Sequence, residues 1–179
     1  LLMLGCGYFS VGVLDMMHTL TFGGMPFFPD IENNVTIQFW IVARFTEALA
    51  LLLAPLLMHR KYQPRTILTI ALLVLLLATS LVVFERLPVM LIAGEGLTQA
   101  KIISEYLIIL ILLIAATTLH HRRQQLDARV LKLTYVSIAM TIAAELAFTP
   151  YADLPGFSLV GGHFFKLTSL WANYNHLVN

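Results

Sequence analysis

Residues 36–58 read TIQFWIVARFTEALALLLAPLLM, an apolar run that is long enough to cross a membrane as a single helix. The run nevertheless contains Arg44 and Glu47 well inside its ends. A charged side chain at that depth costs about 2.5–3.5 kcal/mol on insertion scales, so such residues usually face other helices and mark functional sites. This stretch therefore predicts a membrane-spanning helix with one polar face that neighbouring helices cover.

Five more apolar segments of similar length give six predicted spans in the 179 residues, namely 1–22, 36–58, 66–84, 102–120, 130–150 and 157–178. The composition agrees, because 59% of the residues are hydrophobic and only 12% are charged, against about 25% charged in a soluble domain. All connections are short. The sequence therefore predicts a single all-α domain, a polytopic transmembrane helical bundle, in which the connection 85–101 can hold a short interfacial helix.

Lysine and arginine predict the orientation of this bundle. They fill the connections 59–65 and 121–129, whereas the other connections are acidic or balanced. By the positive-inside rule the two basic connections are cytoplasmic, which places both Leu1 and Asn179 on the cytoplasmic side. Since Leu1 stands directly in an apolar run with no initiator Met, we expect the chain to be cut from a longer protein at both ends.

This orientation places the charged residues of the spans, together with two histidines, in the outer half of the membrane. Most of them come in pairs three or four positions apart, as in Asp15 with His18 or Lys101 with Glu105, so each pair shares one helix face. No charged residue falls in the inner half of any span core, since Lys132 stands at the very start of its span and flanks the basic connection 121–129. We therefore predict a polar ligand-binding pocket with Glu95 close by. Its residues are Asp15, His18, Trp40, Arg44, Glu47, Lys101, Glu105, Glu145, His163 and Lys166.

Three kinds of ligand fit this set of residues. Haem b needs axial ligands such as His18 and His163, which lie at similar depth, while Arg44 and Lys166 can pair with its propionates. A transition metal can use the same two histidines and nearby carboxylates. A small organic ligand can bind the cations through a carbonyl or a carboxylate. The cofactor is therefore left open, and the same ion pairs can also merely fix the register of the helices.

Several function classes are disfavoured by the sequence. The net charge of +1, with the basic residues in loops, gives no sign of nucleic-acid binding, and the single Cys6 excludes an internal disulfide. A transporter would ordinarily need polar residues in both halves of the membrane, and here the inner half is apolar. An intramembrane metal- or haem-dependent enzyme or cytochrome stays as the alternative to a ligand sensor.

Four strings of the sequence, taken in order, resemble the third class of bacterial membrane-associated sensor domains. They are DMMHTLTFGGM at 15–25, QFWIVAR at 38–44 followed by Glu47, GEGLT at 94–98 followed by Lys101 and by SEY at 104–106, and HFFK at 163–166. Together they extend over nearly the whole chain. The resemblance implies an integral-membrane input module of a signalling protein, with several passes through the bacterial inner (cytoplasmic) membrane.

The resemblance also implies features that lie outside this sequence. The intact domain would have seven spans and would work as a homodimer. The expected partner is a cytoplasmic output domain after residue 179, such as a diguanylate cyclase, a phosphodiesterase or a histidine kinase. Residues 1–179 contain no catalytic motif of these kinds, so the domain itself is not predicted to be an enzyme. Ligand binding is expected to shift the last span, 157–178, and thereby to control the output domain.

Overall fold

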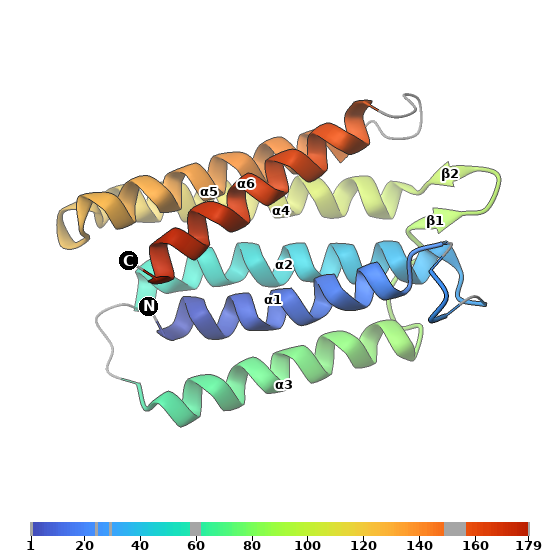
Figure 1. Cartoon of the computed structure of the whole chain (residues 1–179), viewed down its shortest axis with the longest axis horizontal. Coiled ribbons are helices and arrows are strands. Elements are labelled where there is room, and N and C mark those ends of the chain that lie inside the picture. The colour runs from blue at the N-terminus through green and yellow to red at the C-terminus, as the bar shows by residue number, and fades with distance from the viewer. Residues whose placement is uncertain (1, 24, 29, 58–61, 149–156, 179) are drawn as a thin grey trace.

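Each of the six apolar runs forms one long helix in the computed structural model, which describes residues 2–23, 25–28, 30–57, 62–148 and 157–178 (Figure 1). The side chains of 157–163 and 175–178 are outside this description. The helices are α1 (Leu2–Leu20), α2 (Asn33–Leu57), α3 (Pro64–Val83), α4 (Gln99–His121), α5 (Ala128–Phe148) and α6 (Phe157–Val178). A 3-10 turn, η1 (Arg123–Gln125), and two short strands, β1 (Leu91–Ile92) and β2 (Gly96–Leu97), complete the elements. The predicted all-α class is therefore confirmed.

Four of these helices, within the described residues, are long and apolar enough to cross a membrane: α2, α3, α4 and α5. The other two, α1 and α6, are among the helices that carry the predicted polar site, including Asp15 and Lys166. The multi-pass membrane class is thus supported by the helices. Six spans and the cytoplasmic placement of both ends stay predictions.

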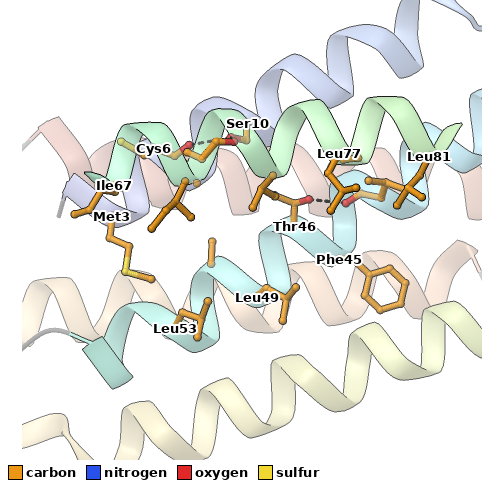
Figure 2. A pocket seen from close by; sticks show the side chains of 17 residues that line it. Met3, Cys6, Ser10, Phe45, Thr46, Leu49, Leu53, Ile67, Leu77 and Leu81 are labelled. Atoms are coloured by element: carbon orange, nitrogen blue, oxygen red, sulfur yellow. Dashed lines mark hydrogen bonds between the residues drawn. The ribbon is translucent and has the colours of Figure 1, made fainter. Parts of the chain in front are cut away.

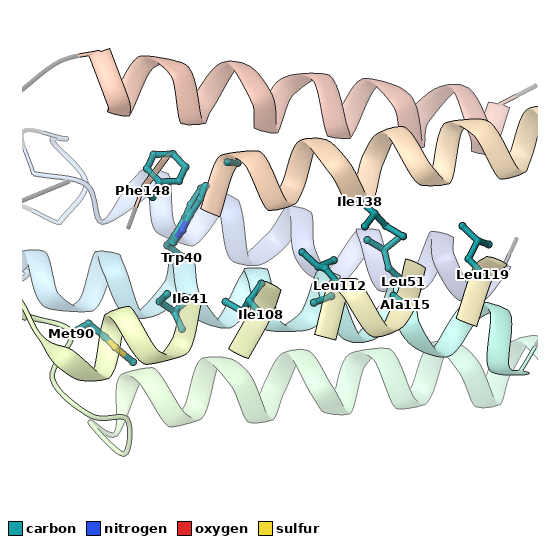
Figure 3. Close-up of a cluster of buried hydrophobic side chains, with 12 residues drawn as sticks. Trp40, Ile41, Leu51, Met90, Ile108, Leu112, Ala115, Leu119, Ile138 and Phe148 are labelled. Carbon is teal, nitrogen blue, oxygen red and sulfur yellow. The ribbon is translucent and has the colours of Figure 1, made fainter. Parts of the chain in front are cut away.

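Helix α2 lies at the centre of the bundle, and α1, α3 and α4 pack around it (Figure 1). Helices α5 and α6 form a closely packed pair, and α5 also packs against α4. On α4, a stripe of apolar side chains at helical spacing faces α2 and α5 (Figure 3). The stripe consists of Ile108, Leu112, Ala115 and Leu119. On the α1 side, Gly7 permits a close approach, since an added Cβ there would lie 2.8 Å from the Cβ of Ala50.

Helix α3 is the most lipid-like element, because most of its leucines and valines are exposed and only Ala78 and Val82 are buried. Pro64 occupies its first turn, where the missing N–H of proline removes no helical hydrogen bond. The exposed apolar face is what a helix that contacts lipid requires.

The connection 85–101 forms a small hairpin instead of the interfacial helix that its apolar residues allowed. Strands β1 and β2 pair antiparallel, with Leu91 opposite Leu97. Gly94 and Gly96 have φ angles of 85° and 98°, a conformation that glycine adopts without the steric cost of a Cβ. The Asn34 side chain accepts hydrogen bonds from the N–H groups of Met90 (2.7 Å) and Leu91 (3.2 Å), which ties the hairpin to the start of α2.

The packing of α4 yields a test of this core. Leu112 is 0% exposed, whereas its neighbour Leu113 is 50% exposed. We expect Leu112→Ala to lower the free energy of unfolding of the detergent-purified domain by about 2–4 kcal/mol, because it removes buried methyl groups and leaves a cavity. Leu113→Ala is the control and should change it by less than about 0.5 kcal/mol. Equal losses in the two variants would contradict the packing of α4.

Candidate functional site

Arg44, near the middle of α2, is the centre of a buried group of charges. Its Nη2 donates to both carboxylate oxygens of Asp15 on α1, at 2.5 and 2.6 Å. Its Nη1 donates to Oε2 of Glu47, one turn further along α2, at 2.6 Å. The guanidinium carbon lies 4.6 Å from the centre of the Trp40 ring, so the cation also stacks on an aromatic face. The side chain of Arg44 is 0% exposed.

Glu47 links Arg44 to a lysine of α6. The same Oε2 atom that binds Arg44 also accepts from Nζ of Lys166. The Tyr8 hydroxyl of α1 donates to Oε1, the other oxygen of Glu47, at 3.4 Å. The order Asp15, Arg44, Glu47, Lys166 alternates in sign, and these four residues are called the ion chain below. It joins α1, α2 and α6.

A second ion pair lies between α4 and α5. Nζ of Lys101 is 2.5 Å from Glu105 and donates to the carbonyl oxygen of Phe148, the last residue of α5, at 2.8 Å. Glu145 is completely buried and lies within electrostatic range of Arg44, Glu47, Lys101 and Glu105. The Glu145 carboxyl therefore connects the ion chain with the Lys101–Glu105 pair.

Charge balance explains how so many ionisable groups can be buried together. The group contains four carboxyl groups (Asp15, Glu47, Glu105 and Glu145) and three cations (Arg44, Lys101 and Lys166). Charges that leave water lose their hydration, and only close opposite charges and hydrogen bonds offset that loss. Alternation of sign provides this compensation, with one carboxyl group in excess.

His18 lies beside this group. Its Nδ1 is 2.8 Å from the carbonyl oxygen of Thr36, and its ring centre is 5.3 Å from that of Trp40. A carbonyl oxygen can only accept, so Nδ1 carries the proton, and in a neutral ring Nε2 is then the nitrogen with the lone pair. Histidines that bind metals commonly donate their other N–H to a carbonyl in this way.

The structure brings together nine of the ten residues that the sequence placed in a common site. His163 lies on α6, one turn before Lys166, but its side chain is outside the described residues. Glu95 is not part of the group, because it is exposed in the turn of the hairpin. Among the side chains that the structure describes, no three His, Cys, Asp or Glu residues are grouped so that they could hold a metal ion. Ligand binding by the nine residues stays a prediction.

A separate groove is apolar and contains none of these ten residues. It has a volume of about 380 Å³ and lies between α1, α2 and α3 (Figure 2). Phe45, Leu49 and Leu77 are among the side chains that line it, with the hydroxyls of Ser10 and Thr46 as its polar groups. The charged residues of α2 therefore point to a different side of that helix from Phe45 and Leu49.

Except for Thr141, which shares a helix face with Glu145 four positions later, the uncharged polar residues near the site were not identified from the sequence. The Tyr8 hydroxyl donates a hydrogen bond to Glu47. The carbonyl oxygen of Thr36 accepts from the His18 ring, and the Thr36 hydroxyl donates to the carbonyl oxygen of Thr21 at 2.5 Å. Further hydroxyls continue the site between α5 and α6. The available signal was the recurrence of Ser, Thr and Asn three or four positions from the charged residues, as with Ser169 and Lys166.

A family model described as a membrane-associated sensor domain, MASE3, matches residues 1–179. The chain belongs to the MASE3 family. No curated protein and no solved structure matches it. The resemblance that the four sequence strings suggested is thus confirmed, and the MASE3 assignment supports a membrane protein that acts as a sensory input domain in signal transduction and is not itself a catalyst.

The buried Arg44 of this MASE3 domain yields a second test. Arg44→Met removes the cation that Asp15 and Glu47 share, which leaves carboxylates buried without their partner. We expect a loss of about 3–5 kcal/mol in the free energy of unfolding in detergent. Arg129→Met, which changes an exposed arginine at the start of α5, is the matched control and should have an effect below about 0.5 kcal/mol. The ion chain would be disproved as a stabilising centre if both variants unfolded alike.

Proposed function

We propose that this MASE3 domain is the ligand-sensing transmembrane input domain of a bacterial signal-transduction protein, and that the ion chain with its neighbours forms the input site. One observation carries the proposal. The ion chain joins α1 and α2 to α6, the last helix, through the Glu47–Lys166 pair. A ligand that weakens or replaces one of these pairs changes how α6 is held, and α6 is the helix that leads to the C-terminus.

The chemistry of buried ion pairs favours a switch over a purely structural core. Replacing a buried ion pair by apolar side chains of similar volume often leaves a protein equally stable or more stable. Stability alone therefore does not explain why this bundle has buried ion pairs. They do offer two alternatives, because each charge can exchange one partner for another. A sensor needs two states to which its ligand binds unequally, and alternative pairings supply such states.

The Arg44 donor and the His18 lone pair indicate which chemical groups a ligand of this site would contain. The Nε atom of Arg44 is buried and has no hydrogen-bond partner among the described residues, so it can donate to an oxygen of a ligand. Nε2 of His18 can bind a metal ion or accept a hydrogen bond. Haem b could use both groups, through its iron and its propionates. A transition metal would use Nε2 of His18, and a small organic acid or carbonyl compound would use the Arg44 donor. His163 would be the second axial ligand in the haem proposal.

The position in the cell follows from the same proposal. The domain crosses the bacterial inner membrane several times, with both ends in the cytoplasm, because the basic connections 59–65 and 121–129 favour that side. The input site then lies in the outer half of the membrane. An output domain, such as a diguanylate cyclase, a phosphodiesterase or a histidine kinase, follows α6 in the cytoplasm, and two copies act as a homodimer.

The ligand classes are separated by measurements on one detergent-purified sample: an ultraviolet–visible spectrum, metal analysis and native mass spectrometry. Haem gives a Soret band, a metal gives a stoichiometric signal without that band, and an organic ligand gives only a mass shift. We expect one of the three, reduced at least about tenfold in His18→Ala, because a residue that supports a ligand typically costs 10–100-fold when it is removed.

Two variants complete this experiment. His163→Ala should abolish a Soret band or a metal signal if His163 is the second ligand. His120→Ala is the control, because His120 is exposed at the opposite end of α4 and contacts only the Arg123 side chain among the hydrogen bonds described (2.7 Å). A protein that carries none of the three ligands, or a ligand that His18→Ala leaves at full occupancy, would contradict the proposed input site.

A further inference from the structure

The apolar groove between α1, α2 and α3 is separate from the ion chain, since no member of the ion chain lines it (Figure 2). Its volume of about 380 Å³ falls in the range of about 300–1,000 Å³ that is typical of small-molecule sites. An apolar cavity of only about 150 Å³ is already large enough to bind benzene. The groove therefore has room for a ligand of its own.

Two apolar stripes form the long walls of this groove. On α3 the stripe recurs at spacings of three and four residues, which places it on one face of the helix. It consists of Ile67, Ile70, Val74, Leu77 and Leu81. The stripe on α2 has the same spacing and consists of Val42, Phe45, Leu49 and Leu53. Gly7 and Ala50, where α1 and α2 approach closely, also line the groove, and their small size leaves room between the walls.

The hydroxyl groups in the groove already donate within the protein. The Ser10 hydroxyl donates to the carbonyl oxygen of Cys6 or of Ala71, each 3.3 Å away. The Thr46 hydroxyl donates to the carbonyl oxygen of Val42 at 2.8 Å. Because a hydroxyl has a single proton, neither side chain has a donor left for a ligand. No charged residue is among those that line the groove, so the lining favours an apolar occupant.

The mouth of the groove meets hydrocarbon when the bundle is in a membrane. Helices α2 and α3 are both long and apolar enough to cross a bilayer. Their groove-lining side chains are exposed in the isolated chain, with Leu49 at 44%, Ile70 at 54% and Leu77 at 60%. Lipid tails are as apolar as leucine, so a tail can enter the groove sideways without passing through water.

The length of the groove indicates an extended chain. At 1.5 Å per residue, the lining on α2 from Val42 to Leu53 extends over about 16 Å. The lining on α3 from Ile67 to Leu81 extends over about 21 Å. One leaflet of a bilayer is about 15 Å deep, half of a hydrocarbon core of about 30 Å. A single lipid tail is thus long enough to occupy most of the groove.

We infer that the groove binds one acyl chain of a membrane phospholipid. The chain lies between the two stripes, covers Leu49, Ile70 and Leu77, and thereby joins the outer side of α3 to α2. This site does not depend on the proposed input site, because the two share no residue and the acyl chain needs no polar contact.

The test uses a phosphatidylcholine with a photoreactive diazirine in one acyl chain, mixed into phosphatidylcholine nanodiscs that contain the domain. After illumination, mass spectrometry maps the modified residues. Any bilayer lipid can modify the exposed faces of α3. We expect additional adducts at Cys6 and Ser10, because both line the groove, and Ser10 is only 1% exposed.

A pair of tryptophan variants isolates the groove. Val74→Trp fills it from the α3 wall and should lower the adducts at Cys6 and Ser10 at least about tenfold, the loss expected when about two methylene groups are no longer buried. Leu73→Trp introduces the same ring one residue earlier, at a 58% exposed position that does not line the groove, and should leave these adducts unchanged. If Val74→Trp does not fold, Leu49→Trp fills the groove from α2 instead.

The outcomes are separate from those of the proposed function. Adducts that are confined to the exposed faces of α3, or adducts at Cys6 and Ser10 that Val74→Trp leaves at full level, would overturn the inference. A second copy of the domain seated over the groove would also prevent adducts at Cys6 and Ser10, and would overturn it too. Groove adducts that Val74→Trp removes would support the inference, even in a protein that carries no ligand at the ion chain.

Discussion

A guanidinium that is completely shielded from water and lipid must be surrounded by acceptors, and Arg44 imposes this requirement on the bundle. Its donors reach Asp15 on α1 and Glu47 on α2, and Glu47 in turn requires a second cation, which Lys166 of α6 provides. The mutual position of α1, α2 and α6 is thus fixed by charge near the middle of α2 and α6. Elsewhere in the bundle, apolar packing of the kind seen along α4 determines how the helices approach each other.

This division of the molecule matters for a sensor. Apolar contacts such as those of Leu112 are insensitive to small ligands, whereas ion pairs can exchange partners and respond to any group that brings charge or a strong hydrogen bond. In the proposed mechanism the ion chain is the responsive part, because it joins α6 to α1 and α2 through the Glu47–Lys166 pair.

Much of this arrangement could be predicted from the sequence because helix length and spacing are local properties. The span 36–58 and its neighbours follow from apolar length, and the gathering of charges follows from the positions of Arg44, Glu47 and Lys166 within their spans once the basic loops set the orientation. Which charges pair depends on how helices are arranged around one another, and the spacing within one helix does not contain that information. Asp15, for example, binds Arg44 of another helix rather than its helical neighbour His18.

Residues outside these patterns were missed for identifiable reasons. The hairpin has strands of two residues, too short for any periodicity, and depends on the positive φ of Gly94 and Gly96. Tyr8 stands alone in an apolar stretch of α1 and acquires a role only through Glu47 on another helix.

The most direct test of the central claim is the distance between α4 and α6, measured by electron paramagnetic resonance in nanodiscs. Spin labels are placed at the exposed positions Leu113 and Tyr174 in a Cys6→Ser background, which contains no other cysteine. If the ion chain holds α6, Lys166→Met shifts or broadens the distance distribution, whereas Lys132→Met, at an exposed lysine of α5, leaves it as in the unsubstituted protein. Identical distributions in the two variants would contradict the account.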